Sequence, residues 1–205
     1  PQDGLFFDPA SISAKIIKPR DKHPGLRIKL IAHLGNALST LQLDIGFSDA
    51  RYPPPMIKQF PVILSSPPPS VQVYAIETVI AEKVHALFKH GSINSRLKDI
   101  YDIRFIAGTQ KIEGIILSEA IRSTLIMASS VYNIALIIFD EGYITIPRQK
   151  QWDALVRKIG FENDKLEFSV VLNELGTFLN PVLDSITKDT KFALKWDASL
   201  GWEWI

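Results

Sequence analysis

Lys83 interrupts an apolar stripe, and this position makes it the first residue to consider for chemistry. From Ile76 to Phe88 the apolar residues recur every three or four positions, which is typical of a helix buried on one side. A wheel at about 100° per residue places Lys83 between Val79 and Leu87 on that side. An unpaired buried ammonium is unfavourable. Two interpretations stay open: the stem packs while its head reaches the rim, or the cation lines a cleft and meets phosphate oxygens.

Asp99 is the second charge in an unexpected position. A helix is expected at 96–108, and two isoleucines lie close to Asp99 on its wheel, so the carboxylate sits on a largely apolar flank. Asp102, in contrast, follows Lys98 by four residues and can pair with it on the surface. The amphipathic pattern therefore accounts for Asp102 but leaves Lys83 and Asp99 unexplained.

Asp44 is a third candidate, in the middle of a predicted strand at 41–47. The alternation of that strand puts its large apolar residues on one face and Asp44 on the other. Asp is a poor strand former. A solvated polar face explains it, and so does a carboxylate aimed into a cleft; the residues alone favour the solvated face.

The elements that must position these three residues change character along the chain. The first half alternates with a period of two and predicts strands at 11–18, 26–34 and 41–47, with Gly35-Asn36 as a hairpin turn. Residues 51–70 hold seven of the thirteen prolines and predict an extended surface connection. Short strands are also expected at 60–64 and 71–75.

The second half follows a helical period. Besides the two helices that hold Lys83 and Asp99, helices are expected at 115–128, 148–159 and 164–186. The fold class is therefore α+β: a sheet region at 1–75 that contains the Pro-rich connection, and a mostly helical region at 76–205. The C-terminal tail holds three of the four tryptophans, and packing explains them better than base stacking, because basic residues are not interleaved with the rings.

Composition excludes several classes of protein. With 23 Lys+Arg against 22 Asp+Glu, the formal net charge of the 205 residues is +1, so any RNA contact must come from a local cationic cleft around Lys83, Arg96 and Lys98. The absence of cysteine removes disulfide scaffolds and thiol catalysis, and it fits the cytoplasm. No apolar run reaches the roughly 18 residues of a membrane span, so no membrane partner is expected.

Residues 77–103 contain two motifs that occur together in a known family. They are Ala81-Glu82-Lys83, on the first helix, and the stretch Asn94-Ser95-Arg96-Leu97-Lys98-Asp99-Ile100-Tyr101-Asp102. This block resembles the AbiEii/AbiGii-type toxin family of the nucleotidyltransferase superfamily. Weaker resemblance extends to residues 3–9, 41–50 and 151–158 and to the tail, so it covers most of the chain.

The resemblance implies a function and a set of roles. The reaction would be transfer of a nucleoside monophosphate from an NTP to an RNA acceptor such as tRNA, in a toxin with a cognate antitoxin. Lys83 would contact the triphosphate together with Arg96 and Lys98, and Asp99 would act with Lys83 as a catalytic residue. Asp44 would help to hold Mg²⁺.

The family also has a glycine–serine motif with a nearby acid pair, expected before residues 3–9. The 205 residues do not contain it. The resemblance therefore predicts an N-terminally truncated member, whether a truncated gene product, half of a split gene or a fragment. Two functions stay open: a nucleotidyltransferase toxin, or a degenerate non-catalytic homologue that binds nucleotide, RNA or an antitoxin.

Overall fold

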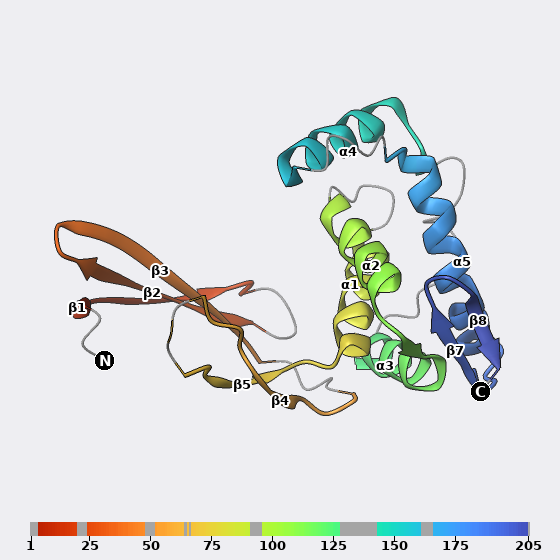
Figure 1. Ribbon diagram of the computed structural model, residues 1–205, viewed down its shortest axis with the longest axis horizontal. Helices are drawn as coiled ribbons and strands as arrows, with labels where there is room; N and C mark the ends of the chain where they lie inside the picture. The colour runs from red at the N-terminus through yellow and green to blue at the C-terminus, as the bar shows by residue number, and fades with distance from the viewer. Residues whose placement is uncertain are drawn as a thin grey trace. The chain divides into compact units, whose positions relative to one another are not determined.

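The computed structural model describes residues 4–19, 24–47, 52–63, 65, 67–90, 96–127, 143–160 and 166–204 (Figure 1). The chain divides into two compact units, Pro1–Asp49 and Ala50–Ile205, and each is described by itself. The expected α+β class is confirmed, with an antiparallel sheet first and helices afterwards. The Pro-rich residues group with the second unit, so the expected division after residue 75 stays a prediction.

The first unit is a three-stranded antiparallel sheet. Its strands are β1 (Leu5–Ile17), β2 (Gly25–Leu34) and β3 (Ala37–Gly46), in that order across the sheet. All three expected strands are present, and β1 begins earlier than expected because a register shift between Asp8 and Ser13 lets it continue. The expected turn is confirmed: Leu34 pairs with Ala37, and Gly35 adopts a φ of 57°, which glycine tolerates.

The register sorts this sheet into two chemically different faces. Cross-strand partners share a face, and the pairs between β2 and β3 alternate between apolar and polar. The apolar pairs are Leu26–Ile45, Ile28–Leu43 and Leu30–Leu41. Arg27–Asp44 and Lys29–Gln42 occupy the other face, so Asp44 does face away from the apolar surface, as the alternation predicts.

The second unit begins with a hairpin in the Pro-rich segment. β4 (Met56–Gln59) pairs antiparallel with β5 (Ser70–Val73). The strand expected at 60–64 is wrong: the ladder ends at Gln59, since Pro61 has no N–H to continue it, and only the Phe60 N–H reaches the Pro69 carbonyl, at 2.9 Å. The strand expected at 71–75 is present, shifted by one to two residues.

In the described segments that follow, five helices build the core of the second unit. They are α1 (Ile76–His90), α2 (Leu97–Thr109), α3 (Gly114–Met127), α4 (Ile146–Ile159) and α5 (Phe168–Thr187). Each was expected from its period, within a few residues at the ends. The first two residues of the 94–102 motif, Asn94 and Ser95, lie outside the described residues. The helices enclose one apolar cluster that includes Ile80, Val84, Leu87, Ile100, Ile103, Phe168, Val171 and Phe178.

A small sheet closes the second unit at its C-terminal end. β6 (Ile112–Glu113), β7 (Leu194–Asp197) and β8 (Gly201–Trp204) pair antiparallel in that order. The Trp196 indole N–H donates to the Ala107 carbonyl of α2 at 2.7 Å, and that of Trp202 donates to the Phe178 carbonyl of α5 at 2.9 Å. The expectation that the tail packs is therefore met by tryptophans that tie the last strands to two helices.

None of the described helices is both long and apolar enough to cross a membrane.

Candidate functional site

The candidate site lies on α1 and α2, the two helices in which the sequence places a charged residue on an apolar flank. Ile80, Val84 and Leu87 of α1 are buried, as are Ile100 and Ile103 of α2, and these residues belong to the same apolar cluster. Packing of the two helices brings their remaining polar positions together beside the core. The charges of α1 and α2 therefore meet in a place that is shielded on one side by apolar side chains.

Lys83 lies at the centre of this arrangement. Its ammonium donates to Oδ1 of Asp99 at 3.2 Å and to Oδ2 of Asp102 at 2.6 Å. The side chain is 20% exposed, so the stem is packed and the head reaches a half-buried ion network. The apparent anomaly of a lysine on an apolar stripe is thus resolved by two carboxylates from the next helix. The two bonds use two of the three ammonium donors.

Asp99 is the most deeply buried member. Its side chain is 7% exposed, and Nε of Arg96 lies 2.8 Å from the oxygen that Lys83 does not contact. Asp99 is also in the first turn of α2, where the helix dipole favours a negative charge. Each carboxylate oxygen therefore lies close to a different cation, which offsets the cost of burying the charge, although Oδ2 accepts no hydrogen bond from the described residues.

Asp102 links the buried part of the network to the surface. It accepts from Lys83 and also from Lys98, whose Nζ lies 2.8 Å from the same oxygen. Burial alone would raise the pKa of Asp102, but the hydrogen bonds from Lys83 and Lys98 outweigh it and hold the pKa below its ordinary value. The expected surface pair with Lys98 is present, while the contact with Lys83 was missed because it joins residues 19 apart on different helices.

These five residues, which we call the ion network, can bind an anion. Three cations (Lys83, Arg96 and Lys98) face two carboxylates (Asp99 and Asp102), so one positive charge remains in excess. Lys98 is 71% exposed and Arg96 is 54% exposed, which leaves their outer surfaces open to a ligand. An arrangement that keeps ammonium and guanidinium groups in fixed positions is suited to phosphate oxygens.

Asp44, the third predicted residue, belongs to the first unit and has its own partner. Nε and Nη2 of Arg27, on the neighbouring strand, each donate to one of its carboxylate oxygens at 2.7 Å. These hydrogen bonds lower the pKa of Asp44 against a smaller opposing effect of desolvation. Both groups are substantially exposed, so the pair agrees with the solvated face that the residues alone favoured.

The described residues do not by themselves provide a magnesium site. No group of three or more His, Asp or Glu side chains among them gathers around one point. Both oxygens of Asp44 are engaged by Arg27, and both oxygens of Asp99 face cations. A divalent ion needs several oxygen ligands, so Mg²⁺ would require further ligands besides these. The role of Asp44 as a metal ligand stays a prediction.

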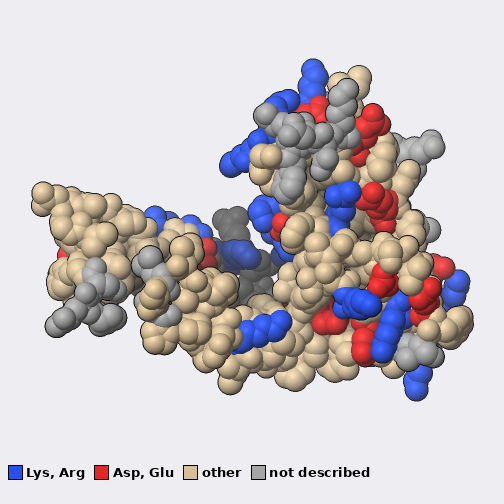
Figure 2. All heavy atoms as spheres, in the orientation of Figure 1, with Lys and Arg blue, Asp and Glu red and all other residues tan. Residues whose placement is uncertain are grey.

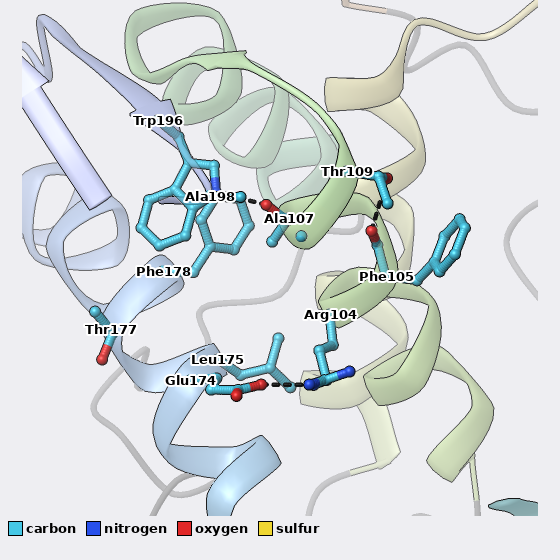
Figure 3. Close-up of a pocket in the computed structure, with 11 residues that line it drawn as sticks. Arg104, Phe105, Ala107, Thr109, Glu174, Leu175, Thr177, Phe178, Trp196 and Ala198 are labelled. Carbon is cyan, nitrogen blue, oxygen red and sulfur yellow. Dashed lines mark hydrogen bonds and ion pairs between the residues drawn. The ribbon is translucent and has the colours of Figure 1, made fainter. Parts of the chain in front are cut away.

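A pocket of about 490 Å³ opens on a different part of the second unit, between α2, α5 and β7 (Figure 3). Arg104 and Glu174 form an ion pair there at 2.5 Å, and Trp196 closes it beside Ala107. None of the residues predicted from the sequence lines it. No feature of the sequence pointed to the pocket, because it is assembled from residues about 70 to 90 positions apart.

Comparison with known proteins gives one match. Residues 2–180 match the family model described as nucleotidyl transferase AbiEii toxin, type IV TA system. The match includes all three candidate residues, and Trp196 and Trp202 lie beyond it. No curated protein and no solved structure matches the chain.

Proposed function

The chain belongs to the AbiEii nucleotidyl transferase toxin family, and from this membership we propose that the ion network on α1 and α2 binds the phosphates of an NTP during nucleotidyl transfer. The family is part of a type IV toxin–antitoxin system, so a nucleotide substrate and an antitoxin partner follow from membership. The finer proposal is that the acceptor is an RNA hydroxyl, with tRNA as the first candidate.

One observation carries the proposal: Lys83 is held by two carboxylates and still has a donor to offer. A lysine kept only for packing would direct its head to solvent. Here Asp99 and Asp102 fix the ammonium, so a phosphate oxygen meets a cation that is already oriented. Arg96 and Lys98 add exposed positive charge next to it.

The proposed step is a substitution at the α-phosphorus. A bond forms between the acceptor oxygen and the α-phosphorus, the bond from that phosphorus to the bridging oxygen breaks, pyrophosphate leaves, and the hydroxyl proton passes to water. In this step Lys83, Arg96 and Lys98 offset the negative charge of the phosphates. The contacts of Asp99 favour a positioning role, since both its oxygens face cations. Its expected catalytic role remains a prediction.

Mg²⁺ is proposed as a cofactor on the family resemblance alone. When bound, a magnesium ion supplies additional charge to the phosphate oxygens. Asp44 is the carboxylate expected to contribute to its site, and Arg27 would have to release it. The described residues gather no group of three such ligands, so ligands besides Asp44 would be needed to complete its site.

The test is transfer of label from an α-³²P-labelled NTP to an unfractionated tRNA pool. We expect the chain to label RNA and Lys83→Met to lose at least tenfold in rate, while Lys188→Met keeps full activity. Lys188 is a suitable control because its only described ion pair is with Asp184 on the surface of α5. Equal rates for the two variants would refute the role given to Lys83.

A second candidate function is nucleotide binding without transfer. It is favoured by the pairing of Asp44 with Arg27 and by the lack of a three-carboxylate group in the described part of the chain. The same assay separates the two. Binding of NTP that depends on Lys83, measured by calorimetry, together with no labelled RNA, would favour the non-catalytic homologue.

A further inference from the structure

The cations of the second unit fall into two groups according to their partners. Most of those in the described segments face an acid within 4 Å, including the three of the ion network and Arg104, Lys111, Arg122, Lys188 and Lys195. The side chains of Lys150, Arg157 and Lys158 of α4 differ, since none has an ion pair or hydrogen bond with a described residue, and the same holds for the separate residues Lys58 and Lys191. The helix therefore holds three cations that the fold does not use.

These three residues share one side of α4. Trp152 and Val156 are buried and define the inner side of the helix. At 100° per residue, Lys150, Arg157 and Lys158 fall within about 100° of one another on the opposite side, and all three are exposed. We call this side the α4 basic face. In Figure 2 blue atoms project from α4, at the top of the view.

Within the described part of the chain, the neighbours of the α4 basic face do not neutralise it. Asp153 is the acid of α4 and precedes Arg157 by four residues, the spacing of a helical ion pair. However, its carboxylate accepts from the amide of Gln149 at 2.8 Å instead. Arg148, the remaining cation of α4, lies over the Tyr143 ring at 3.8 Å and donates to the Tyr143 carbonyl. The helix dipole favours Arg157 and Lys158 in the last turn but gives no reason for Lys150.

We infer that the α4 basic face binds the phosphate backbone of the RNA acceptor. This rests on the proposed function and names the surface that would hold its substrate. Lys150 and Lys158 are eight positions apart on α4, so the cations form a row about 12 Å long. A row of this kind suits a polyanion, whereas a single small phosphate needs cations that converge.

The chemistry of α4 favours RNA over a membrane surface. A helix that lies on a bilayer inserts large apolar residues beside its cations. Here the exposed residues between Lys150 and Arg157 are Gln151 and Ala154, Trp152 is fully buried, and the one large exposed apolar residue described in α4 is Ile146 at its first position. Trp152 packs against Tyr101 of α2, with ring centroids 6.5 Å apart. The α4 basic face thus belongs to a helix that contacts α2, which carries the exposed cations Arg96 and Lys98 of the ion network.

The experiment compares two triple variants with the same net charge. The test variant is Lys150→Gln/Arg157→Gln/Lys158→Gln, and the control is Lys58→Gln/Lys111→Gln/Lys191→Gln, whose sites are dispersed over β4 and two loops. The probes are fluorescently labelled tRNA and a labelled 20-nucleotide poly(U). Each variant is titrated into each probe without NTP, at KCl concentrations between 50 and 200 mM. Circular dichroism checks that both variants fold.

The expected result follows from counterion release. For single strands each phosphate contact adds about 0.7 to the slope of log K against log salt. Loss of three contacts lowers that slope by about 2, which is about 100-fold in affinity at 0.1 M salt if the curves converge at 1 M. The control should change neither slope nor affinity to this extent.

Other results would contradict RNA binding by the α4 basic face. Equal effects of the two triple variants, or no binding of RNA by the unmodified chain at 50 mM KCl, would overturn it. Equally tight binding to polyglutamate, or binding to vesicles with phosphatidylserine, would assign the surface to an acidic protein or a membrane and would also overturn it. RNA binding that needs the α4 basic face, in a chain that transfers no nucleotide, would leave this inference standing and refute the transfer reaction alone.

Discussion

Replacement of Lys83 by methionine tests whether the ion network is a half-buried structure or a solvated pair of surface charges. The change removes two charge-assisted hydrogen bonds, each of which contributes about 1.5–3 kcal/mol when a charged group is well shielded. The side chain of Lys83 is 20% exposed, and each carboxylate keeps another cation, Arg96 or Lys98. Two such bonds at the lower end of the range would contribute about 3 kcal/mol. Because of the remaining exposure and the remaining cations we expect less, a total loss of about 2 kcal/mol.

Lys98→Met is the matched control. Lys98 contacts the same oxygen of Asp102 at 2.8 Å, but it is 71% exposed and pairs at a spacing of four residues on one helix. Such pairs contribute about 0.3–0.5 kcal/mol. The two changes should therefore differ about fourfold in effect, because Lys83 is less exposed than Lys98 and also contacts Asp99.

Tryptophan fluorescence during thermal or urea unfolding measures both variants. All four tryptophans follow residue 150, so the signal reports the second unit alone. For a unit of this size a loss of 2 kcal/mol lowers Tm by about 4–8 °C, against about 1–2 °C for the control. Equal shifts of 2 °C or less in both variants would refute the half-buried network.

The pH dependence adds a second check on the same variant. The pKa of Asp102 is lower in the folded chain than in the unfolded chain. Its contribution is therefore present above the unfolded pKa and is lost as the pH falls through the folded one. The difference between the chain and Lys83→Met should narrow on acidification below pH 4. If the difference in stability between the two proteins widened below pH 4, the inferred lowering of the Asp102 pKa would be contradicted.

Three further predictions concern the C-terminal sheet, its contact with α3 and the end of α2. The pKa of Asp197 is lowered to about 2 by hydrogen bonds from the hydroxyl and backbone N–H of Ser199 and by Lys111. The stability that this carboxylate confers should therefore be lost as the pH falls from about 4 to about 2. Ser199→Ala should reduce this loss of stability in acid, measured by fluorescence-monitored unfolding. Gly114→Ala should destabilise by about 1–3 kcal/mol, since its Cβ would lie 2.5 Å from the Phe192 ring and 2.7 Å from the Leu194 carbonyl. Gly108→Ala, whose Cβ meets nothing within 4 Å, should instead stabilise α2 by about 0.5–1 kcal/mol, and a loss of stability there would show that the local packing is misjudged.

The parts of the fold that follow from local periodicity could be predicted from the sequence. The three strands of the first unit have an alternating pattern, and the five helices have a period near 3.6, so both appear close to their expected bounds. The strand at 56–59 was missed because four flanking prolines obscure a ladder that exists only through its pairing with β5. β6, with two residues, has no local signal at all.

The candidate site could be predicted only as a set of anomalies. Lys83 and Asp99 stood out because each is a charge on an apolar flank, and the structure joins them at 3.2 Å. The position of Asp102 on its own helix gave a sufficient local partner in Lys98, so nothing in the sequence pointed to its contact with Lys83. The lack of an ion pair for Arg157 could not be predicted either, because the Asp153 carboxylate accepts a hydrogen bond from Gln149 and does not pair with Arg157.

The bond from the Trp196 indole to Ala107 spans 89 residues, and this has a consequence for synthesis of the protein on the ribosome. The last turn of α2, the helix that also carries Asp99 and Asp102, receives this donor only when residue 196 has emerged. A growing chain can form α1 and α2 early, but the donor that supports the end of α2 is made 89 residues after its acceptor. A chain that stopped before residue 196 would therefore lack the strand that supplies this donor.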